Sequence, residues 1–374
     1  MLHSKGKMKK LLCLFLIICT VLCVSGCKTK WSDLPENNIV TQPRKNIFSP
    51  ARTIIAGQPV ESICNLSNTY YKLTQEKRLN VAYFGSESTT KASNGNSWCT
   101  LTTNWFKTAF PEAQITEINA TKGVTNSYWG YFAVDESVIA QNPDLVFLEF
   151  AARDFTADFT VEQSVANMEG IICKIRKTLP KTDIVVVLTT NFRNLDTEYK
   201  TLTAHKNLAE YYGIPYINIS NDLNAEFLNE LLATTSQNVT QPADHKMPTG
   251  DYISNVSKSS KIIYAKDIEN APDWELKTSK SNAIAFMGET LYGKGDDVIN
   301  IEFEGTGLGI VTALEENISI KIVVDNSNPI YMDLLKSNSY QVPLLENLIP
   351  KKHNVKIEFL NGKKIILGGL LISE

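Results

Sequence analysis

Four short apolar runs separated by helix-length segments constrain the fold of this 374-residue chain more than any other feature. The runs are VAYF (81–84), LVFLEF (145–150), IVVVL (184–188) and YINI (216–219). None of them alternates apolar with polar residues, so each predicts a strand that is buried on both faces, as in a parallel sheet. The intervening segments 97–110, 161–179 and 197–212 are typical of helices. Strands that alternate with helices predict a three-layer α/β/α sandwich over residues 61–268.

The pattern changes after about residue 282. The segments VINIEF (298–303), ISIKIVV (318–324) and NVKIEF (354–359) alternate apolar and polar residues, which is the period of strands with one buried face. Asn361-Gly362 is a strong hairpin signal. These features predict a C-terminal all-β sandwich domain over residues 282–374. Its role is open between carbohydrate contact and packing on the α/β domain, and the candidate stacking residues are Tyr292, Tyr331 and Tyr340.

The first 27 residues have the organisation of a bacterial lipoprotein signal peptide. A lysine-rich start precedes the apolar segment 11–24, which is too short to span a bilayer as a mature helix, and the segment ends in VSGC. We expect Cys27 to become the lipidated first residue of a protein anchored in the cell envelope, facing the periplasm or the exterior. An ordinary cleaved signal peptide is the alternative. The polar, proline-containing segment 28–60 predicts a tether.

Composition excludes several functions. The formal net charge of −3 gives no electrostatic basis for nucleic-acid binding. Beyond the signal peptide and Cys27, only Cys64, Cys99 and Cys173 remain, without the spacing of metal ligands. We therefore expect neither a metal nor another cofactor. A disulfide between Cys64 and Cys99 is compatible with an oxidising compartment, but the sequence does not establish it.

Ser86 is the candidate nucleophile. It follows the first predicted strand and Gly85, and ligands of open parallel sheets bind beyond the carboxyl ends of the strands. A serine nucleophile needs a base, usually histidine. Of the histidines beyond the signal peptide, we read His205 as structural and His353 as a turn residue. His245 lies in a loop beyond the last α/β strand, which makes it the candidate base.

Several segments in order resemble a known family. They are LNVAYFGSEST (79–89), FPEAQITEINATKGVTNSYWG (110–130), NPDLVFLEFAARD (142–154), LAEYYGIPYINI (208–219) and the spacing of His245 to Gly250. They are similar to the sequence blocks of SGNH (GDSL-like) hydrolases, particularly bacterial esterases that act on carbohydrates. The resemblance implies that Ser86 attacks an ester of an acylated polysaccharide or oligosaccharide while His245 accepts its proton. The backbone N–H groups of Ser86 and Gly123 would bind the oxyanion.

The chain departs from the family pattern at two positions. Arg153 stands where the third block has an oxyanion-binding Asn, and it either takes over that role or binds an acidic ligand group. Pro242 stands where an Asp would orient the histidine, which leaves Asp244, directly next to His245, as the substitute. Three functions follow: an esterase that removes acetyl or other small acyl groups from carbohydrate, a catalytically impaired carbohydrate-binding lipoprotein, and a cell-wall polysaccharide O-acetyltransferase.

Overall fold

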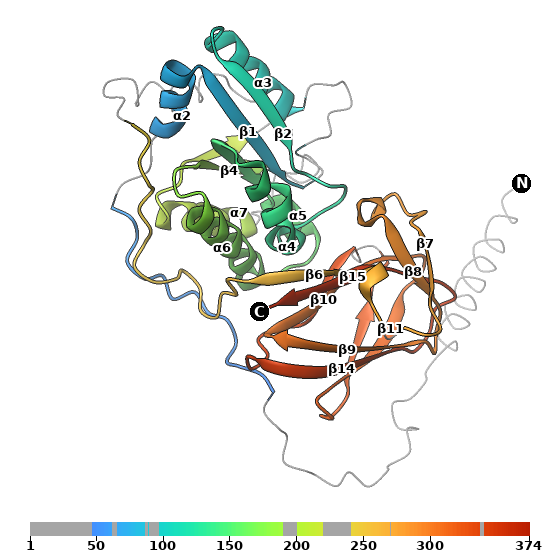
Figure 1. The fold of residues 1–374 in the computed structure, drawn as a ribbon. Coiled ribbons are helices and arrows are strands. Elements are labelled where there is room, and N and C mark those ends of the chain that lie inside the picture. Colours follow the sequence, from blue (N-terminus) through green and yellow to red (C-terminus); the bar gives the residue numbers. More distant parts are fainter. Residues whose placement is uncertain are drawn as a thin grey trace, which may run out of the picture. The chain divides into compact units, whose positions relative to one another are not determined.

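Five parallel strands form the sheet of the N-terminal module, in the order β2-β1-β3-β4-β5 (Figure 1). The strands are β1 (Arg78–Gly85), β2 (Gln114–Asn119), β3 (Leu145–Glu149), β4 (Asp183–Thr189) and β5 (Tyr216–Ile219). This order matches the flavodoxin-like doubly wound sheet, whose strand order reverses between β1 and β3. The computed structural model describes residues 47–61, 66–86, 89, 97–189, 200–219, 241–269, 271–336 and 340–374.

Helices cover both faces of this sheet. One face carries α2 (Ser67–Tyr71), η2 (Lys72–Glu76) and α3 (Trp98–Ala109); the other carries α4 (Ser127–Ser137), η4 (Ile139–Gln141), α5 (Ala151–Thr156), α6 (Val161–Thr178) and α7 (Lys200–Tyr211). The side chains of β1 divide between two cores, with Val81 and Tyr83 packed under α3 and Ala82 and Phe84 packed under α4 and α6. Burial on both faces explains the uninterrupted apolar runs. The predicted three-layer α/β/α sandwich is confirmed.

The predicted helices form where local signals favour them. Ser97 caps α3 by accepting a hydrogen bond from the N–H of Thr100. Thr160 and Gln163 form a reciprocal capping box at the start of α6. Gly213, after α7, adopts a left-handed φ of 62°, which suits a glycine at a helix end.

The sequence pattern missed β2 and α4. β2 lies at the edge of the sheet and its residues are mostly exposed, so it lacks the apolar run that marked the other strands. α4 is buried along most of its length, so its sequence shows no polar face and no helical period.

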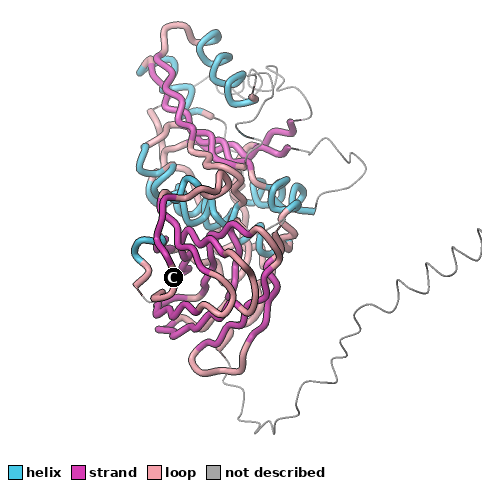
Figure 2. Tube along the Cα trace, turned by 90° about the vertical axis from the view of Figure 1, so that its right-hand side faces the viewer, coloured by secondary structure: helices cyan, strands magenta, loops and turns pink. Residues whose placement is uncertain are grey.

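The C-terminal module consists of two antiparallel sheets, and strands make up most of it (Figures 1 and 2). The larger sheet has the order β13-β10-β15-β8-β7, with β6 also paired to β15, and the smaller sheet has the order β12-β11-β14-β9. The elements are β6 (Ser260–Tyr264), η5 (Ala265–Asp267), β7 (Glu275–Thr278), η6 (Ala285–Met287), β8 (Glu289–Gly293), β9 (Val298–Gly305), β10 (Gly307–Leu314), β11 (Ile318–Val324), β12 (Ile330–Leu334), β13 (Gln341–Leu345), β14 (Lys351–Phe359) and β15 (Ile365–Ser373). The predicted β-sandwich is confirmed.

Three details differ from the sequence expectations. β6 pairs with β15 and β7 pairs with β8, so the β-module begins at about residue 260 rather than 282. Asn361-Gly362 forms a turn, with φ of 106° at Gly362, but it joins strands of different sheets rather than a hairpin. The segment 47–60, expected within the tether, bridges to both modules through Phe48–Leu348, Ile54–Ile253 and Gln58–Thr249.

The two modules share a core within the unit formed by residues 45–374. Leu370 and Ile372 of β15 face the interior of the β-sandwich, whereas Leu371 faces the core of the α/β module. Every residue of β15 and β10 is buried. This explains why only the strands of the smaller sheet alternate, because one face of that sheet meets solvent.

Candidate active site

Ser86 lies directly after β1, at the point where the strand order of the sheet reverses. Its neighbour Gly85 pairs with Glu149, the last residue of β3. The N–H of Ser86 donates to the backbone oxygen of Glu149 over 2.8 Å, which continues the ladder by one residue. Because ligands of doubly wound sheets bind at such a point, the structure places Ser86 where the sequence analysis expected a nucleophile. The same backbone bond occupies the N–H that we had assigned to the oxyanion.

The Glu149 carboxylate gathers the side chains at this edge. Ser86 Oγ donates to Glu149 Oε2 over 2.7 Å, and Thr89 Oγ1 donates to the same oxygen over 3.1 Å. Thr189, the last residue of β4, donates to Oε1 over 2.5 Å. Glu149 is fully buried and Ser86 is 2% exposed. Hydroxyls from the ends of β1 and β4 therefore converge on one carboxylate at the end of β3.

Gly85 allows this close approach. A Cβ atom at this position would lie 2.3 Å from the backbone oxygen of Glu149 and 2.4 Å from Thr89 Oγ1. Both distances are far shorter than any van der Waals contact, so the position admits only glycine without a shift of the backbone.

The loop 120–126, which contains Gly123, is tied to the same strand end on both sides of that glycine. Thr121 Oγ1 accepts from the N–H of Gly85 over 3.0 Å, and Thr125 Oγ1 donates to the oxygen of Gly85 over 3.2 Å. Gly123 is exposed, has a left-handed φ of 62°, and its N–H donates to no group among the described residues. An exposed N–H of this kind can donate to a ligand, and the role of Gly123 in binding an oxyanion stays a prediction.

Two further contacts hold that loop. Asn126 caps α4 by accepting from the N–H of Trp129 over 3.0 Å. Gln341 of β13, which is buried, donates from Nε2 to the oxygen of Val124 over 3.1 Å. The β-module therefore fixes one side of the loop that carries Gly123.

Arg153 lies on α5, four residues after Glu149 and at the same edge of the sheet. Its side chain is half-buried. Within the described part of the chain, no group accepts from its buried Nε atom. An unpaired buried guanidinium nitrogen is costly, so this donor is available to an anionic group of a ligand or intermediate.

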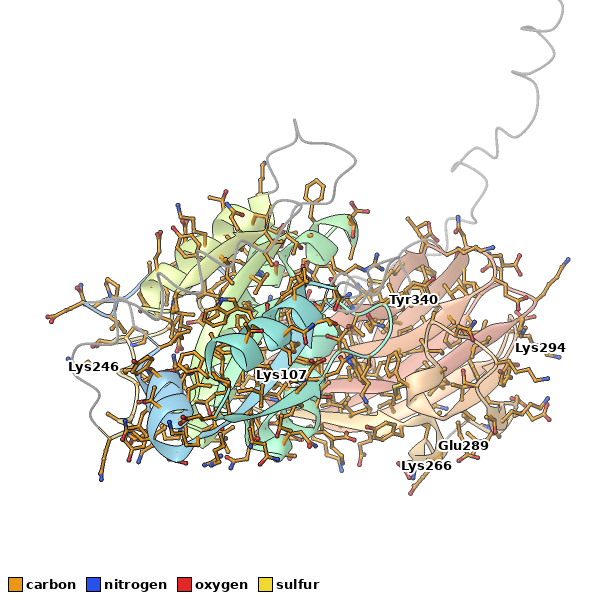
Figure 3. The ribbon with its side chains drawn as sticks, turned by 90° about the horizontal axis from the view of Figure 1, so that it is seen from above. Lys107, Lys246, Lys266, Glu289, Lys294 and Tyr340 are labelled. Atoms are coloured by element: carbon orange, nitrogen blue, oxygen red, sulfur yellow. The ribbon has the colours of Figure 1, made fainter. Side chains whose placement is uncertain are left out.

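His245 is not brought to Ser86. Its Nε2 lies 2.8 Å from Oδ1 of Asp183, the first residue of β4. Asp183 pairs with Leu145, four residues before Glu149, so about 13 Å of strand separates the two ends. Lys246 lies on the side of the module where α2 is drawn (Figure 3).

The prediction that His245 reaches Ser86 is therefore wrong in this structure. The segment 241–250 returns along the amino edge of the sheet, where Asn68 of α2 bonds to the backbone of Ala243. Asp244 is exposed and no contact joins its side chain to His245; the acid beside the histidine is Asp183. The sequence spacing could not reveal this, because it does not determine to which edge a loop returns.

The other described histidines are structural, and His353 is not the turn residue that we expected. His205 is buried on α7, with Nε2 2.8 Å from Ser164 Oγ, which donates to Asp154 Oδ2 over 2.5 Å. Burial raises the pKa of Asp154 to about 7 and lowers the pKa of His205 to about 4. His353 is buried in β14, where its ring nitrogens lie 2.9 Å from Asp325 and from the oxygen of Ile349.

The buried hydrogen bonds of Asp154, Ser164 and His205 connect helices that flank the site. Asp154 Oδ1 accepts from the N–H of Ser127, at the start of α4, over 2.8 Å. Asp154 thus links α5, which carries Arg153, to the helix that follows the loop containing Gly123.

Sequence reasoning missed Glu149 and Thr189. Their signal is visible in retrospect: a charged residue and a hydroxyl residue lie at the carboxyl ends of otherwise apolar runs, LVFLE and IVVVLT. A carboxylate inside an apolar run is costly to bury without partners, so its presence there indicates a site residue as strongly as the serine does.

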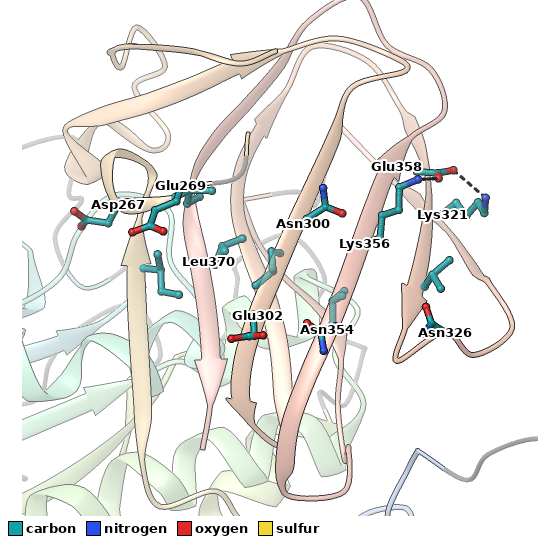
Figure 4. Close-up of a pocket in the computed structure, with 15 residues that line it drawn as sticks. Asp267, Glu269, Asn300, Glu302, Lys321, Asn326, Asn354, Lys356, Glu358 and Leu370 are labelled. Carbon is teal, nitrogen blue, oxygen red and sulfur yellow. Dashed lines mark hydrogen bonds and ion pairs between the residues drawn. The ribbon is translucent and has the colours of Figure 1, made fainter. Parts of the chain in front are cut away.

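The β-module offers a separate polar groove of about 850 Å³, lined by the smaller sheet together with β6, residues 267–269 and β15 of the larger sheet (Figure 4). Asn300 and Glu302 of β9, with Asn354 and Lys356 of β14, point into it. None of the three candidate stacking tyrosines lines this groove: Tyr331 is 67% exposed, and Tyr292 and Tyr340 are half-buried against the shared core.

The predictions about cysteines, a metal site and the membrane concern residues that the structure describes only in part. Cys99 is a buried free thiol whose Sγ donates to the oxygen of Thr89 over 2.7 Å, and burial raises its pKa; Cys27 and Cys64 lie outside the described residues. Among the residues that the structure describes, no cluster of His, Cys, Asp or Glu is arranged to hold a metal. No described helix is long and apolar enough to cross a membrane.

Comparison with known proteins identifies the fold. No family model and no curated protein matches this sequence. Two solved structures of a two-domain esterase active on acetylated mannans are similar at 20% identity over 86% of this chain. The form co-crystallised with mannopentaose matches over 97% of its own length with a TM-score of 0.66, and the other over 99% with a TM-score of 0.67. At this identity the likeness establishes a shared two-domain fold: a parallel α/β module followed by an antiparallel β-module.

Proposed function

We propose that this protein is a carbohydrate esterase that removes acetyl or other small acyl groups, with Ser86 as the nucleophile. The observation that carries the proposal is the position of Ser86 Oγ at the switch point of the sheet, 2.7 Å from a buried carboxylate. The fold is shared with an esterase active on acetylated mannans, which supports an acylated polysaccharide or oligosaccharide as the substrate. The SGNH-type sequence blocks support the same assignment.

The reaction uses groups on three strand ends. Ser86 Oγ attacks the ester carbonyl, the N–H of Gly123 and the guanidinium of Arg153 stabilise the oxyanion, and the sugar hydroxyl leaves. Water then releases the acid from the acyl-enzyme. If a sugar hydroxyl replaces that water, the same site becomes an O-acetyltransferase.

A second function has one observation in its favour. None of the three histidines in the described part of the chain lies at Ser86, and histidine is the usual base for a serine nucleophile. A carbohydrate-binding lipoprotein on a hydrolase fold would need no histidine at Ser86. In that case the polar groove of the β-module would be the site that binds carbohydrate.

Hydrolysis and covalent labelling separate the two functions. The chain from residue 28 onward is expected to hydrolyse p-nitrophenyl acetate and to release acetate from acetylated manno-oligosaccharides, and Ser86→Ala is expected to abolish both activities. A fluorophosphonate should label the wild type but not the variant. Unchanged hydrolysis by Ser86→Ala would refute the assignment. A wild type that binds glycan without hydrolysis or labelling would establish the binding function instead.

The envelope location is part of the proposal and rests on the N-terminal sequence alone. The full chain expressed in a bacterium is expected to incorporate labelled fatty acid and to fractionate with membranes, whereas Cys27→Ser does neither. Fatty-acid incorporation that persists in Cys27→Ser would contradict the lipid anchor.

A further inference from the structure

We propose that Glu149 is the general base of this site and takes the proton of Ser86 in place of a histidine. The inference rests on the proposed esterase function and adds the residue that activates its nucleophile. It concerns a side chain that the sequence motifs did not single out.

The geometry satisfies the first requirement of a general base. A base must lie within about 2.6–3.2 Å of the atom whose proton it takes, and Glu149 Oε2 lies 2.7 Å from Ser86 Oγ. The backbone fixes this contact, because Gly85 pairs with Glu149 and Ser86 N–H donates to Glu149 O over 2.8 Å. Carboxylate and hydroxyl are therefore held by adjacent strand ends rather than by flexible loops.

Hydroxyl groups contact both oxygens of the Glu149 carboxylate. Ser86 and Thr89 donate to Oε2, and Thr189 donates to Oε1. Thr189 uses the opposite oxygen, Oε1, which keeps Oε2 turned toward Ser86. Glu149 is fully buried and Ser86 is 2% exposed, so their contact is shielded from bulk solvent.

Each step balances with this one acceptor. As Ser86 Oγ bonds to the ester carbon, its proton moves to Glu149 Oε2 and the carbonyl π electrons move to the oxyanion. Collapse of the intermediate breaks the bond to the sugar oxygen, which takes the proton from Glu149. In deacylation, Glu149 accepts a proton from water as the hydroxyl attacks the acyl-enzyme, and then returns it to Ser86 Oγ.

The decisive variant is Glu149→Gln, which keeps the size of the side chain and one acceptor oxygen but replaces the other oxygen with an NH2 group that cannot accept a proton. Loss of a general base costs about 10²–10⁴-fold in rate. We expect kcat and the rate of fluorophosphonate labelling of Ser86 to fall within that range, with the thermal midpoint within a few degrees of the wild type. Wild-type hydrolysis and labelling by folded Glu149→Gln would overturn the inference but leave the esterase assignment intact.

Glu169→Gln is the matched control. Glu169 is also a fully buried glutamate that accepts three hydrogen bonds, from the hydroxyl of Tyr212 and the N–H groups of Tyr252 and Ile253. This substitution is expected to lower the thermal midpoint and to leave kcat unchanged at temperatures where the protein is folded. Equal losses of kcat in folded Glu149→Gln and Glu169→Gln would overturn a chemical role for Glu149.

Two further variants complete the test. Should Glu149→Gln fail to fold, Glu149→Asp decides: its shorter side chain withdraws the carboxylate from Oγ, so a slower labelling rate supports the inference and a wild-type rate overturns it. His245→Gln, at the opposite edge of the sheet, is expected to label at the wild-type rate, and a loss of labelling there would return the role of base to histidine. A wild type that neither hydrolyses esters nor labels would overturn both the function and the inference.

Discussion

At the scale of single residues, the site depends on Gly85 and Glu149, because the absence of a side chain at Gly85 makes room for Glu149. Gly85 has no Cβ, so the backbone oxygen and the carboxylate of Glu149 can approach Ser86. The sequence indicated Gly85 and Ser86 through their place after an apolar run. The charge of Glu149 at the end of an apolar run was a signal, but its contact with Ser86 could not be inferred, because its partners Thr89 and Thr189 are separated from it by 60 and 40 residues.

Gly85→Ala tests this approach. The new Cβ would meet backbone oxygen at 2.3 Å, so β1 and β3 must separate, and overpacking of this kind costs about 1–3 kcal/mol. We expect a lower urea midpoint together with a loss of esterase activity. Gly288→Ala is the control, because its Cβ meets nothing within 4 Å and only its φ of 74° is strained; its activity should match the wild type.

The buried pair Asp154 and His205 gives a test by pH. The folded pKa of Asp154, about 7, exceeds the ordinary 3.8, so the folded chain binds the extra proton and stability falls as pH rises from about 4 to 7. The folded pKa of His205, about 4, lies below 6.5, so the unfolded chain binds the extra proton and stability falls as pH drops from 6.5 to 4. The two contributions oppose each other in the shared range.

Single substitutions should separate the two opposing pH dependences of the free energy of unfolding. In His205→Gln, the free energy of unfolding is expected to decrease with rising pH between about 4 and 7, by at most about 1.4 kcal/mol per unit. In Asp154→Asn, it is expected to decrease with falling pH between about 6.5 and 4. Urea titrations across this range, compared with the wild type, measure both slopes. Identical pH dependence in the three proteins would contradict the assignment.

At the scale of elements, the loop 120–126 contacts both the strand end next to Ser86 and the β-module. It leaves the edge strand β2, passes the end of β1 and enters α4, and each part has a named contact: Thr121 and Thr125 to Gly85, and Gln341 of β13 to Val124. The sequence predicted Gly123 within this region. It could not predict that a residue more than 200 positions later would hold the loop.

Gln341→Met tests that contact. The substitution keeps the length of the side chain but leaves the oxygen of Val124 without its donor, and such a loss costs about 1–3 kcal/mol. We expect kcat/KM to fall because the Gly123 N–H is no longer held in place. Gln58→Met on the segment 47–61, where the backbone rather than the side chain pairs with Thr249, should leave kcat/KM unchanged. Equal kcat/KM in Gln341→Met and the wild type would show that Gln341 of the β-module does not position the loop.

At the scale of the whole molecule, the two modules share one apolar core. Met287, Val311 and Leu371 of the β-module belong to the same apolar core as α4 and α6. Lys174 of α6, which is buried, donates to Ser260 of β6 over 2.5 Å and pairs with Asp135 over 2.7 Å. Burial lowers the pKa of Lys174, so this polar link is itself embedded in the junction.

Calorimetry should therefore record a single unfolding transition for residues 28–374, with equal calorimetric and van't Hoff enthalpies. The fragment 28–281 is expected to aggregate or to lack a cooperative transition, because it exposes the apolar surface that β10 and β15 cover. Two separate transitions in the longer chain, or an independently folded fragment with full esterase activity, would contradict a shared core.

Sequence alone determined the fold class, the three long helices and the strand that precedes Ser86, because apolar periodicity and helix caps are local properties. It also located the loop containing Gly123. Only the tertiary structure decided which groups meet: His245 lies at the amino edge beside Asp183, and Glu149 lies beside Ser86. The reason is that parallel strands bring residues together by register and by edge, and neither can be read from spacing along the chain.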